Sequence, residues 1–321
     1  MQRRALLAGL LAAPAVARAE GPFPDRPIRL VIPWPPGGTN DIVGRLVSEG
    51  MAARLGQPVV IENRGGAGGM LGAEVVAKAT PDGYTLVLGG SGSLTITSLV
   101  QARVPYDVAT AFAPIGLMGV GPNVITVHPS VAARNLRELQ AVARAAPVPL
   151  SYASPGVGST GHAAGAMIAQ ALDVPMEHIP YRGTGPALND LIAGRVQVFT
   201  NALAPLQPHI RSGAARALAI AGRQRSSAMP ELPTTGEQGF PQIEAATWFG
   251  LLATGGTAPE RIARLHAALN AALEDAEIRR RLLEGGLEVE PSASPEEFTR
   301  FFAEDRARWA PVVQRAGMRV D

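Results

Sequence analysis

Residues 27–41 read PIRLVIPWPPGGTND, and this stretch joins a predicted strand to the start of a helix. The run 28–33 is apolar and β-branched and is bounded by prolines, which is typical of a buried strand. A loop rich in glycine and proline follows, and residues 40–55 have the composition of a helix. Because the helix begins directly after the loop, the unpaired N–H groups of its first turn face the space that the loop encloses.

The same strand–loop–helix unit recurs along the chain in two groups. The first group of units ends near residue 90. The second group begins at residue 123 and leads into a proline-rich stretch, residues 229–241. Repeated units of this kind predict parallel strand pairing with helices on both faces of the sheet. The expected strands are 28–33, 58–63, 84–88, 123–128, 150–153, 176–179, 197–200, 215–221 and 247–253, and the expected helices are 40–55, 69–79, 136–146, 159–171, 185–193, 204–212, 259–273, 276–283 and 295–315.

The restart predicts two α/β lobes rather than one long sheet. The residues after 246 supply too few strands for a third domain, so we assign 20–118 and 247–321 to lobe I and 119–246 to lobe II. Two segments then cross between the lobes, near 116–122 and 244–249. Two similar lobes with two crossing segments describe a clamshell. We expect the ligand in the cleft, at the carboxyl ends of the strands.

The composition describes a globular chain without thiol chemistry. Hydrophobic residues make up 46% of the 321 residues, and the absence of cysteine excludes disulfides, thiolate nucleophiles and Cys-based metal sites. The isoelectric point near 9.4 suggests a polyanionic partner. However, Arg3, Arg4 and Arg18 account for three of the 29 basic residues, which leaves 26 against 27 acidic residues. The other arginines form no basic stripe, so we expect no nucleic-acid partner.

Residues 1–19 have the order of a signal peptide. Arg3 and Arg4 precede an apolar run over 5–17, and Ala17-Arg18-Ala19 supplies the small residues of a cleavage site. The arginine pair favours the twin-arginine route, with Sec export as the alternative, and an N-terminal core helix is the competing interpretation of the segment. The run is too short to span a bilayer, and no cysteine follows the cut for a lipid anchor. We therefore expect a soluble periplasmic protein.

Two loops that open helices have the chemistry of an anion site. The glycines of 37–39 let the backbone approach a ligand, and the hydroxyls of 159–160 add donors to a second helix start. Ordinary helix capping is the alternative for Asn40, for Asp41 and for 159–160. The G-x-G-x-x-G pattern at 156–161 lies in mid-chain without the acidic residue of a dinucleotide site, so we expect no nucleotide cofactor.

The sequence contains no recognisable combination of catalytic residues. The five histidines are far apart and none belongs to an H-E-x-x-H motif, so packed or surface roles are expected. His162 is the exception, because it lies one turn into the second of these helices. The loop 89–93 contains Gly-x-Ser but lacks the glycine that completes a nucleophile elbow. We expect no enzyme, no cofactor and no metal site.

A set of motifs runs in order along nearly the whole mature chain. The motifs include PIRLVIPWPPGG at 27–38, GQPVVIENR at 56–64, PDGYTL at 81–86, IPYRG at 179–183 and WFGL at 248–251. Together they strongly resemble the extracytoplasmic solute receptors of tripartite tricarboxylate transporters, often called Bug receptors. The resemblance implies a Venus flytrap (periplasmic-binding-protein) fold with two crossover segments. It also implies that the protein captures a small carboxylate and delivers it to membrane permease subunits.

The resemblance also implies which residues bind the ligand. One departure from the family is Thr200-Asn201, where relatives commonly carry Asp before Asn, and the missing carboxylate disfavours an amino acid cargo. Gly65 replaces a common proline and affects only loop stiffness. The ligand-binding residues expected are Trp34, Pro36, Gly37, Gly38, Thr39, Ser91, Gly158, Ser159, Thr160, His162, Tyr181, Gly183, Thr184 and Asn201.

Two further function classes stay open beside a transport receptor. A sensory binding protein would share the fold and the cleft and present its ligand to a signalling partner. An exported enzyme acting on a small acid would need a nucleophile with a base, and the sequence offers none. For the receptor we expect a monomer that carries neither cofactor nor metal.

The export signal generates a direct prediction. The mature chain should begin at or near Glu20, because Ala17-Arg18-Ala19 is the small-residue site that closes the apolar run. N-terminal sequencing of periplasmic material measures this. Soluble cytoplasmic protein that retains Met1 would contradict both the signal and the periplasmic location.

Overall fold

The computed structural model describes residues 23–319, so the predicted signal peptide 1–19 lies outside the described residues. The observed elements follow the predicted order. The strands are β1 (Ile28–Ile32), β2 (Val59–Asn63), β3 (Thr85–Gly90), β4 (Phe112–Val127), β5 (Leu150–Ser154), β6 (Met176–Pro180), β7 (Val198–Ala202), β8 (Arg216–Ala221), β9 (Ala246–Thr254) and β10 (Glu288–Val289). The helices are α1 (Thr39–Leu55), α2 (Met70–Ala77), α3 (Thr97–Val100), α4 (Leu136–Ala145), α5 (Thr160–Leu172), α6 (Thr184–Ile192), α7 (Gln207–Arg211), α8 (Pro259–Glu274), α9 (Ala276–Glu284) and α10 (Pro295–Arg315), with the short turns η1 (Ala67–Gly69) and η2 (Ser91–Ile96).

The largest differences from the predicted elements concern β4 and η2. The strand expected over 123–128 begins already at Phe112, because the Gly- and Pro-containing stretch before it pairs with β9. Residues 91–96 form a π-helical turn that leads into α3, where a loop was expected. α7 is shorter than the predicted helix 204–212. The early start of β4 depends on its pairing with β9, which lies far away in the sequence, so short-range sequence patterns do not predict it.

The strands form two groups that share β4. Within the groups, β1 pairs in parallel with β2 and β3, and β5 pairs in parallel with β6 and β7. β9 is antiparallel to β3 and β4, and β4 is antiparallel to β7 and β8. The prediction of parallel pairing is therefore confirmed within each group and wrong for the joining strands. Since β4 has 16 residues and pairs in both groups, the hydrogen-bonded path is also continuous instead of two separate sheets.

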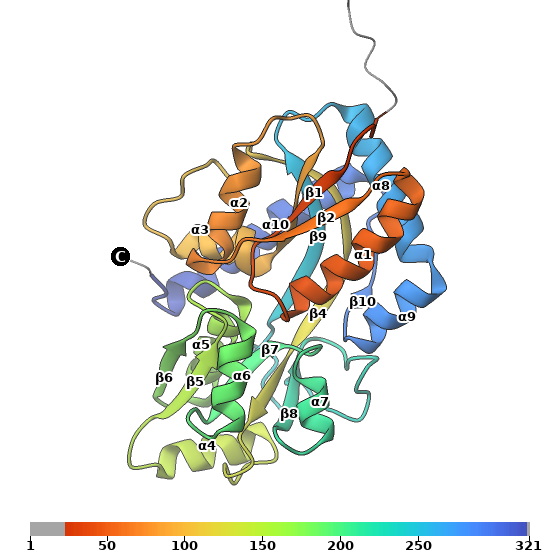
Figure 1. Cartoon of the computed structure of the whole chain (residues 1–321). Helices are drawn as coiled ribbons and strands as arrows, with labels where there is room; N and C mark the ends of the chain where they lie inside the picture. The colour runs from red at the N-terminus through yellow and green to blue at the C-terminus, as the bar shows by residue number, and fades with distance from the viewer. Residues whose placement is uncertain (1–22, 320–321) are drawn as a thin grey trace, which may run out of the picture.

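The predicted two-lobe α/β fold with two crossover segments is confirmed. Figure 1 shows β4 and β9 running side by side from one half of the molecule to the other. The exact lobe boundaries, 20–118 with 247–321 and 119–246, stay a prediction. The C-terminal helix α10 contacts both halves, because Phe298 packs under β9 and Trp309 packs in the cluster around β5 and α5.

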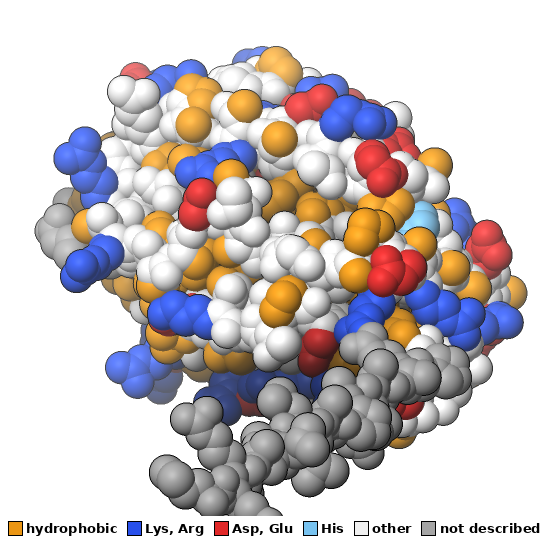
Figure 2. Space-filling view, turned by 90° about the horizontal axis from the view of Figure 1, so that it is seen from above, with side chains coloured by type: hydrophobic (Ala, Val, Ile, Leu, Met, Phe, Trp, Pro, Cys, Tyr) orange, Lys and Arg blue, Asp and Glu red, His pale blue; other side chains and the backbone are white. Residues whose placement is uncertain are grey.

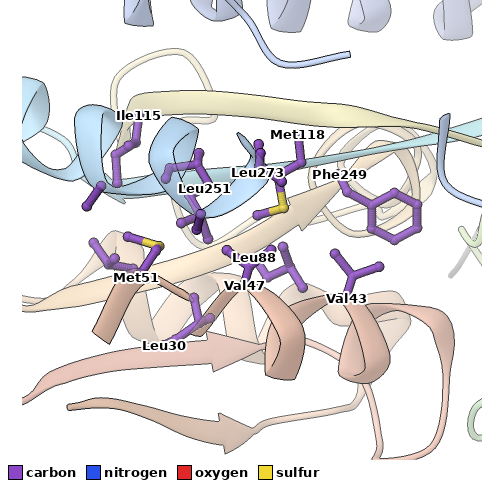
Figure 3. Close-up of a cluster of buried hydrophobic side chains, with 14 of the residues drawn as sticks. Leu30, Val43, Val47, Met51, Leu88, Ile115, Met118, Phe249, Leu251 and Leu273 are labelled. Carbon is purple, nitrogen blue, oxygen red and sulfur yellow. The ribbon is translucent and has the colours of Figure 1, made fainter. Parts of the chain in front are cut away.

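Helix α1 is held against the sheet by an apolar stripe. Val43, Val47 and Met51 lie four residues apart and meet Leu30 and Leu88 of the sheet, as Figure 3 shows. Each such buried side chain contributes about 1.5–3 kcal/mol. Gly44 permits the close approach, because a Cβ there would lie 2.6 Å from Ile32 Cδ1. This packing fixes where the first turn of α1 points.

A buried carboxylate ties three distant segments together. Asp305 of α10 is 4% exposed and accepts hydrogen bonds from the indoles of Trp248 (2.7 Å) and Trp309 (3.1 Å). It also accepts from Thr95 Oγ1 at 2.8 Å, and Arg308 balances its charge at 3.0 Å. These bonds hold η2 and β9, which lie far apart in the sequence, against α10.

Charged side chains of the described surface are mixed in sign. In Figure 2, Lys and Arg side chains are scattered among acidic, apolar and neutral ones. Several are paired, as in Arg26–Asp82 and Arg280–Glu277. The face in this view therefore lacks the continuous basic stripe with which proteins bind a nucleic-acid backbone.

We expect Asp305→Ala to lower the free energy of unfolding by about 3 kcal/mol or more, because two indole N–H groups and a hydroxyl lose their buried acceptor. Urea unfolding followed by circular dichroism measures this. The neighbouring exposed Glu304→Ala serves as the control and should change stability by less than about 0.5 kcal/mol. Equal effects of the two variants would contradict the role given to Asp305.

Candidate functional site

A small cavity lies at the carboxyl ends of the strands. The first turns of α1, α5 and α6 surround it, together with the ends of β3 and β7 and part of β9. Its volume is about 40 Å³, room for only a few water molecules. None of its lining residues is charged. They are Trp34, Pro35, Gly38, Thr39, Asn40, Gly90, Gly92, Ser93, Pro155, Ser159, Thr160, Gly183, Thr184, Asn201, Ala202, Thr247 and Phe249.

We call this small cavity the inner cavity, because a wider one lies beside it. The N-terminus of α1 is open toward the inner cavity. Its cap residue, Gly38, has no side chain to accept a hydrogen bond from the first turn. Thr39 Oγ1 and Asn40 Oδ1 are buried and have no hydrogen-bond partner among the described residues. Buried polar atoms without a protein partner are uncommon, and in the lining of a cavity they are able to hydrogen-bond a molecule bound there. The capping alternative for Asn40 therefore does not describe its side chain.

Asp41 stabilises the loop before α1 rather than facing the cavity. Its carboxylate accepts from Gly37 N (3.0 Å), from the Arg45 guanidinium (3.0 Å) and from Asn63 Nδ2 (3.0 Å). Burial alone would raise the pKa of this carboxyl, but the hydrogen bonds from Arg45, Gly37 and Asn63 lower it below its ordinary value. Asp41 thus remains ionised and paired, which limits its repulsion of an anion in the cavity.

At α5 the two adjacent hydroxyls have different roles. Ser159 Oγ donates to Gly156 O (2.7 Å) and accepts from His162 N (3.2 Å), so it is the helix cap. Thr160 Oγ1 lies 2.7 Å from Thr247 Oγ1 of β9, in a hydrogen bond in which either hydroxyl is the donor. Because one of these protons makes the bond, the other remains free to donate into the cavity.

At α6 the start of the helix faces α1 across the cavity. Gly183 caps the helix at φ 110°, a conformation that favours glycine. Thr184 Oγ1 accepts from Asn201 Nδ2 at 3.2 Å, which leaves its own proton free to donate. A Cβ at Gly38 would lie 3.4 Å from Thr184 Oγ1, so the two helix starts approach closely.

The structure brings most of the predicted site residues together. Trp34, Gly38, Thr39, Ser159, Thr160, Gly183, Thr184 and Asn201 line the inner cavity. Pro36 and Tyr181 line a wider outer cavity that shares Trp34 and Gly183 with it. Four of the predicted residues line neither cavity, and their part in binding stays a prediction: Gly37, Ser91, Gly158 and His162.

The four residues outside the cavities have structural contacts instead. Ser91 Oγ joins Ala246 O to Trp248 N, and Gly158 N donates weakly to His162 Nδ1 (3.4 Å). Sequence reasoning missed Thr247, Ser93 and Phe249 of the inner cavity. Thr247 and Phe249 belong to a strand, which no loop motif marks, whereas Ser93 lies in the loop 89–93 discussed above without having been assigned to the ligand. The pairing of β9 with β3 and β4 brings Thr247 and Phe249 to the site.

His162 belongs to a buried aromatic stack. Its ring lies parallel to that of His178 with the centroids 3.9 Å apart, and Tyr152 stacks on the other side of His178. Burial, with the neighbouring His178, lowers the pKa of His162 to about 3, and burial lowers the pKa of His178 to about 4. Both rings are therefore neutral at physiological pH.

The described residues offer little for catalysis or metal binding. Ser154 Oγ lies 2.7 Å from His178 Nε2, but Ser154 is fully buried and no carboxylate among the described residues bonds the other ring nitrogen. Residues 23–319 hold no group of three or more His, Asp or Glu side chains placed to bind a metal ion. The chemistry that the cavity supports is hydrogen-bond donation to an anion.

Comparison with solved structures identifies the class of protein. The periplasmic binding protein BugD matches with a TM-score of 0.87 and 34% identity over 92% of this chain and 99% of its own. MatC (Rpa3494) of Rhodopseudomonas palustris with bound malate matches with a TM-score of 0.85 at 33% identity, and R. palustris Rpa4515 with adipate with 0.88 at 34%. These matches cover 91% and 92% of this chain and 100% and 99% of theirs. The fold is that of a periplasmic binding protein.

The sequence model of the tripartite tricarboxylate transporter family receptor matches residues 43–318. The chain belongs to this family, and the predicted resemblance is confirmed. Between residues 23 and 319 no helix combines the length and the hydrophobicity needed to cross a membrane.

The histidine stack predicts a loss of stability in acid. The folded-state pKa of His162 is below the ordinary value near 6.5, so the unfolded chain takes up the proton first as the pH falls. The stabilisation that depends on neutral His162 is therefore fully present above about pH 6.5 and is lost as the pH falls toward about 3. Between pH 7 and pH 5 this one residue lowers the free energy of unfolding by roughly 2 kcal/mol.

Urea unfolding at a series of pH values measures this dependence. His162→Asn should flatten the decline, because asparagine has no proton to gain, whereas His209→Gln, outside the stack on α7, should leave it unchanged. An unaltered slope in His162→Asn would contradict the assignment.

Proposed function

We propose that the protein is a periplasmic receptor that captures a small carboxylate and delivers it to the permease subunits of a tripartite tricarboxylate-type transporter. The observation that carries the proposal is the convergence of three helix N-termini, those of α1, α5 and α6, on one uncharged cavity. Each terminus presents unpaired N–H groups and a partial positive charge. Two solved relatives are described with malate and with adipate, both carboxylates.

The cavity offers donors that match a carboxylate. Free hydroxyl protons come from Thr39, from Thr184 and from one member of the Thr160–Thr247 pair. Hydrogen bonds to an ionised acceptor are worth about 1.5–3 kcal/mol each. Neutral donors hold the anion without the desolvation of a buried ammonium or guanidinium, which suits a receptor that must also release its cargo.

Binding between two lobes explains how capture is signalled. Thr39 lies on the α1 side, Thr160 and Thr184 lie on the other side, and Thr247 lies on a crossing strand. A carboxylate bonded to all of them stabilises the closed arrangement, which a permease can distinguish from the open one. The cargo is released unchanged, so the proposal includes no catalytic step, and export through the predicted signal peptide places the receptor in the periplasm.

Isothermal titration of the mature chain tests the proposal, with acetate, succinate, malate, adipate, citrate, amino acids and sugars as probes. The best carboxylate should lose at least about tenfold in affinity in Thr39→Val and in Thr184→Val, because each removes one charge-assisted hydrogen bond at nearly constant volume. The exposed Thr80→Val is the control and should bind like the parent chain.

Ser159→Ala should act mainly on the stability of α5, since that hydroxyl is already committed to the cap. Binding restricted to sugars or amines, or carboxylate affinity unchanged in both threonine variants, would refute the proposal.

A further inference from the structure

The inner cavity opens beside a much larger outer one. The two share Trp34, Pro35, Pro155 and Gly183 as lining residues, and the outer cavity has a volume of about 730 Å³ against about 40 Å³ for the inner one. The inner space therefore takes a single carboxylate-sized group. If the proposed function is right, the remainder of any larger cargo lies in the outer cavity.

The wall of the outer cavity carries a single charged side chain, Arg182. The other lining residues include glycines 65, 66 and 68, the prolines and the side chains of Asn63, Gln101 and Tyr181. Asn63 already donates its amide to Trp34 O (3.1 Å) and to Asp41. The electrostatic character of this cavity is therefore set by one cation.

Within residues 23–319, Arg182 makes neither a salt bridge nor a hydrogen bond, and it is exposed. Two carboxylates that contact or adjoin residues of the cavity lining are taken by other partners. Asp190 accepts from Tyr181 Oη and from Arg195, both at 2.7 Å, and Glu62 bonds Arg29 and Arg64. The positive charge of Arg182 is thus available to a ligand.

Arg182 is also within reach of the inner site. It precedes Thr184 by two residues, so their Cα atoms are at most about 7 Å apart. The long guanidinium side chain extends this span into the outer cavity. An unbranched cargo with its first carboxylate at the three helix starts would extend past the shared lining residues into the cavity that Arg182 lines.

We propose that the outer cavity is a second subsite, in which Arg182 binds an anionic group at the far end of the cargo. The receptor then prefers an α,ω-dicarboxylate to a monocarboxylate of equal chain length. Because Arg182 is exposed, the preference is modest and weakens as salt screens the charges. The guanidinium also offers paired N–H donors that match a carboxylate.

Titration calorimetry with matched probes tests this subsite. The pairs are succinate with butyrate, adipate with hexanoate and suberate with octanoate, each with the mature chain at low and at high salt. For the best pair, Arg182→Gln should reduce the ratio of dicarboxylate to monocarboxylate affinity by about fivefold at low salt. Arg182→Lys should retain most of the ratio. Arg211→Gln, an exposed arginine on α7 outside both cavities, should retain all of it.

The outcomes separate this subsite from the proposed function. Equal losses for both members of each pair, an unchanged ratio in Arg182→Gln, or no preference for dicarboxylates in the parent chain would overturn the subsite while leaving carboxylate capture in place. Absence of binding by every carboxylate probe would overturn both.

Discussion

The antiparallel pairing of β4 with β9 is the constraint on which the rest of the structure depends. Its register runs from Phe112 opposite Thr254 to Pro122 opposite Ala246, so the two crossing segments form one ribbon. The parallel strands of each lobe attach to this ribbon and end at the same cleft. Because helices follow the carboxyl ends of those strands, three helix N-termini meet there without any long connecting loop.

The proposed anion site, the inner cavity, has no cation in its lining. Dipoles of helix termini and hydroxyl groups are fixed in place by the sheet, so a carboxylate meets preorganised donors. Asp41, in the first turn of α1, is ion-paired with Arg45 and holds the loop before the helix. Charge is instead placed at the outer cavity, where Arg182 is exposed and water screens it. In our proposals the two cavities therefore recognise anions differently, the inner one by the geometry of its donors and the outer one by charge.

Elements behind the cleft hold the donors in position. Thr247 is adjacent to Trp248, whose indole is fixed by Asp305 of α10, and the same carboxylate binds Thr95 in η2. The histidine stack lies under the first turn of α5 and stays neutral, so it adds no charge behind the site. Since α10 packs in both halves, it connects the lobes to each other and to β9.

The sequence by itself determined the local units: β1 and the glycine loop before α1, the starts of α5 and α6 to within one residue, and motifs specific enough to name the family. These follow from near neighbours in the chain, because turn glycines, caps and apolar periodicity act over a few residues. Only the tertiary structure decided that Thr39 stays unpaired, that Thr247 reaches Thr160, and that the joining strands are antiparallel. Thr247 lies 87 residues from Thr160, and the pairing of β4 with β9 joins residues as far apart as Phe112 and Thr254, so the folded sheet alone brings these partners together.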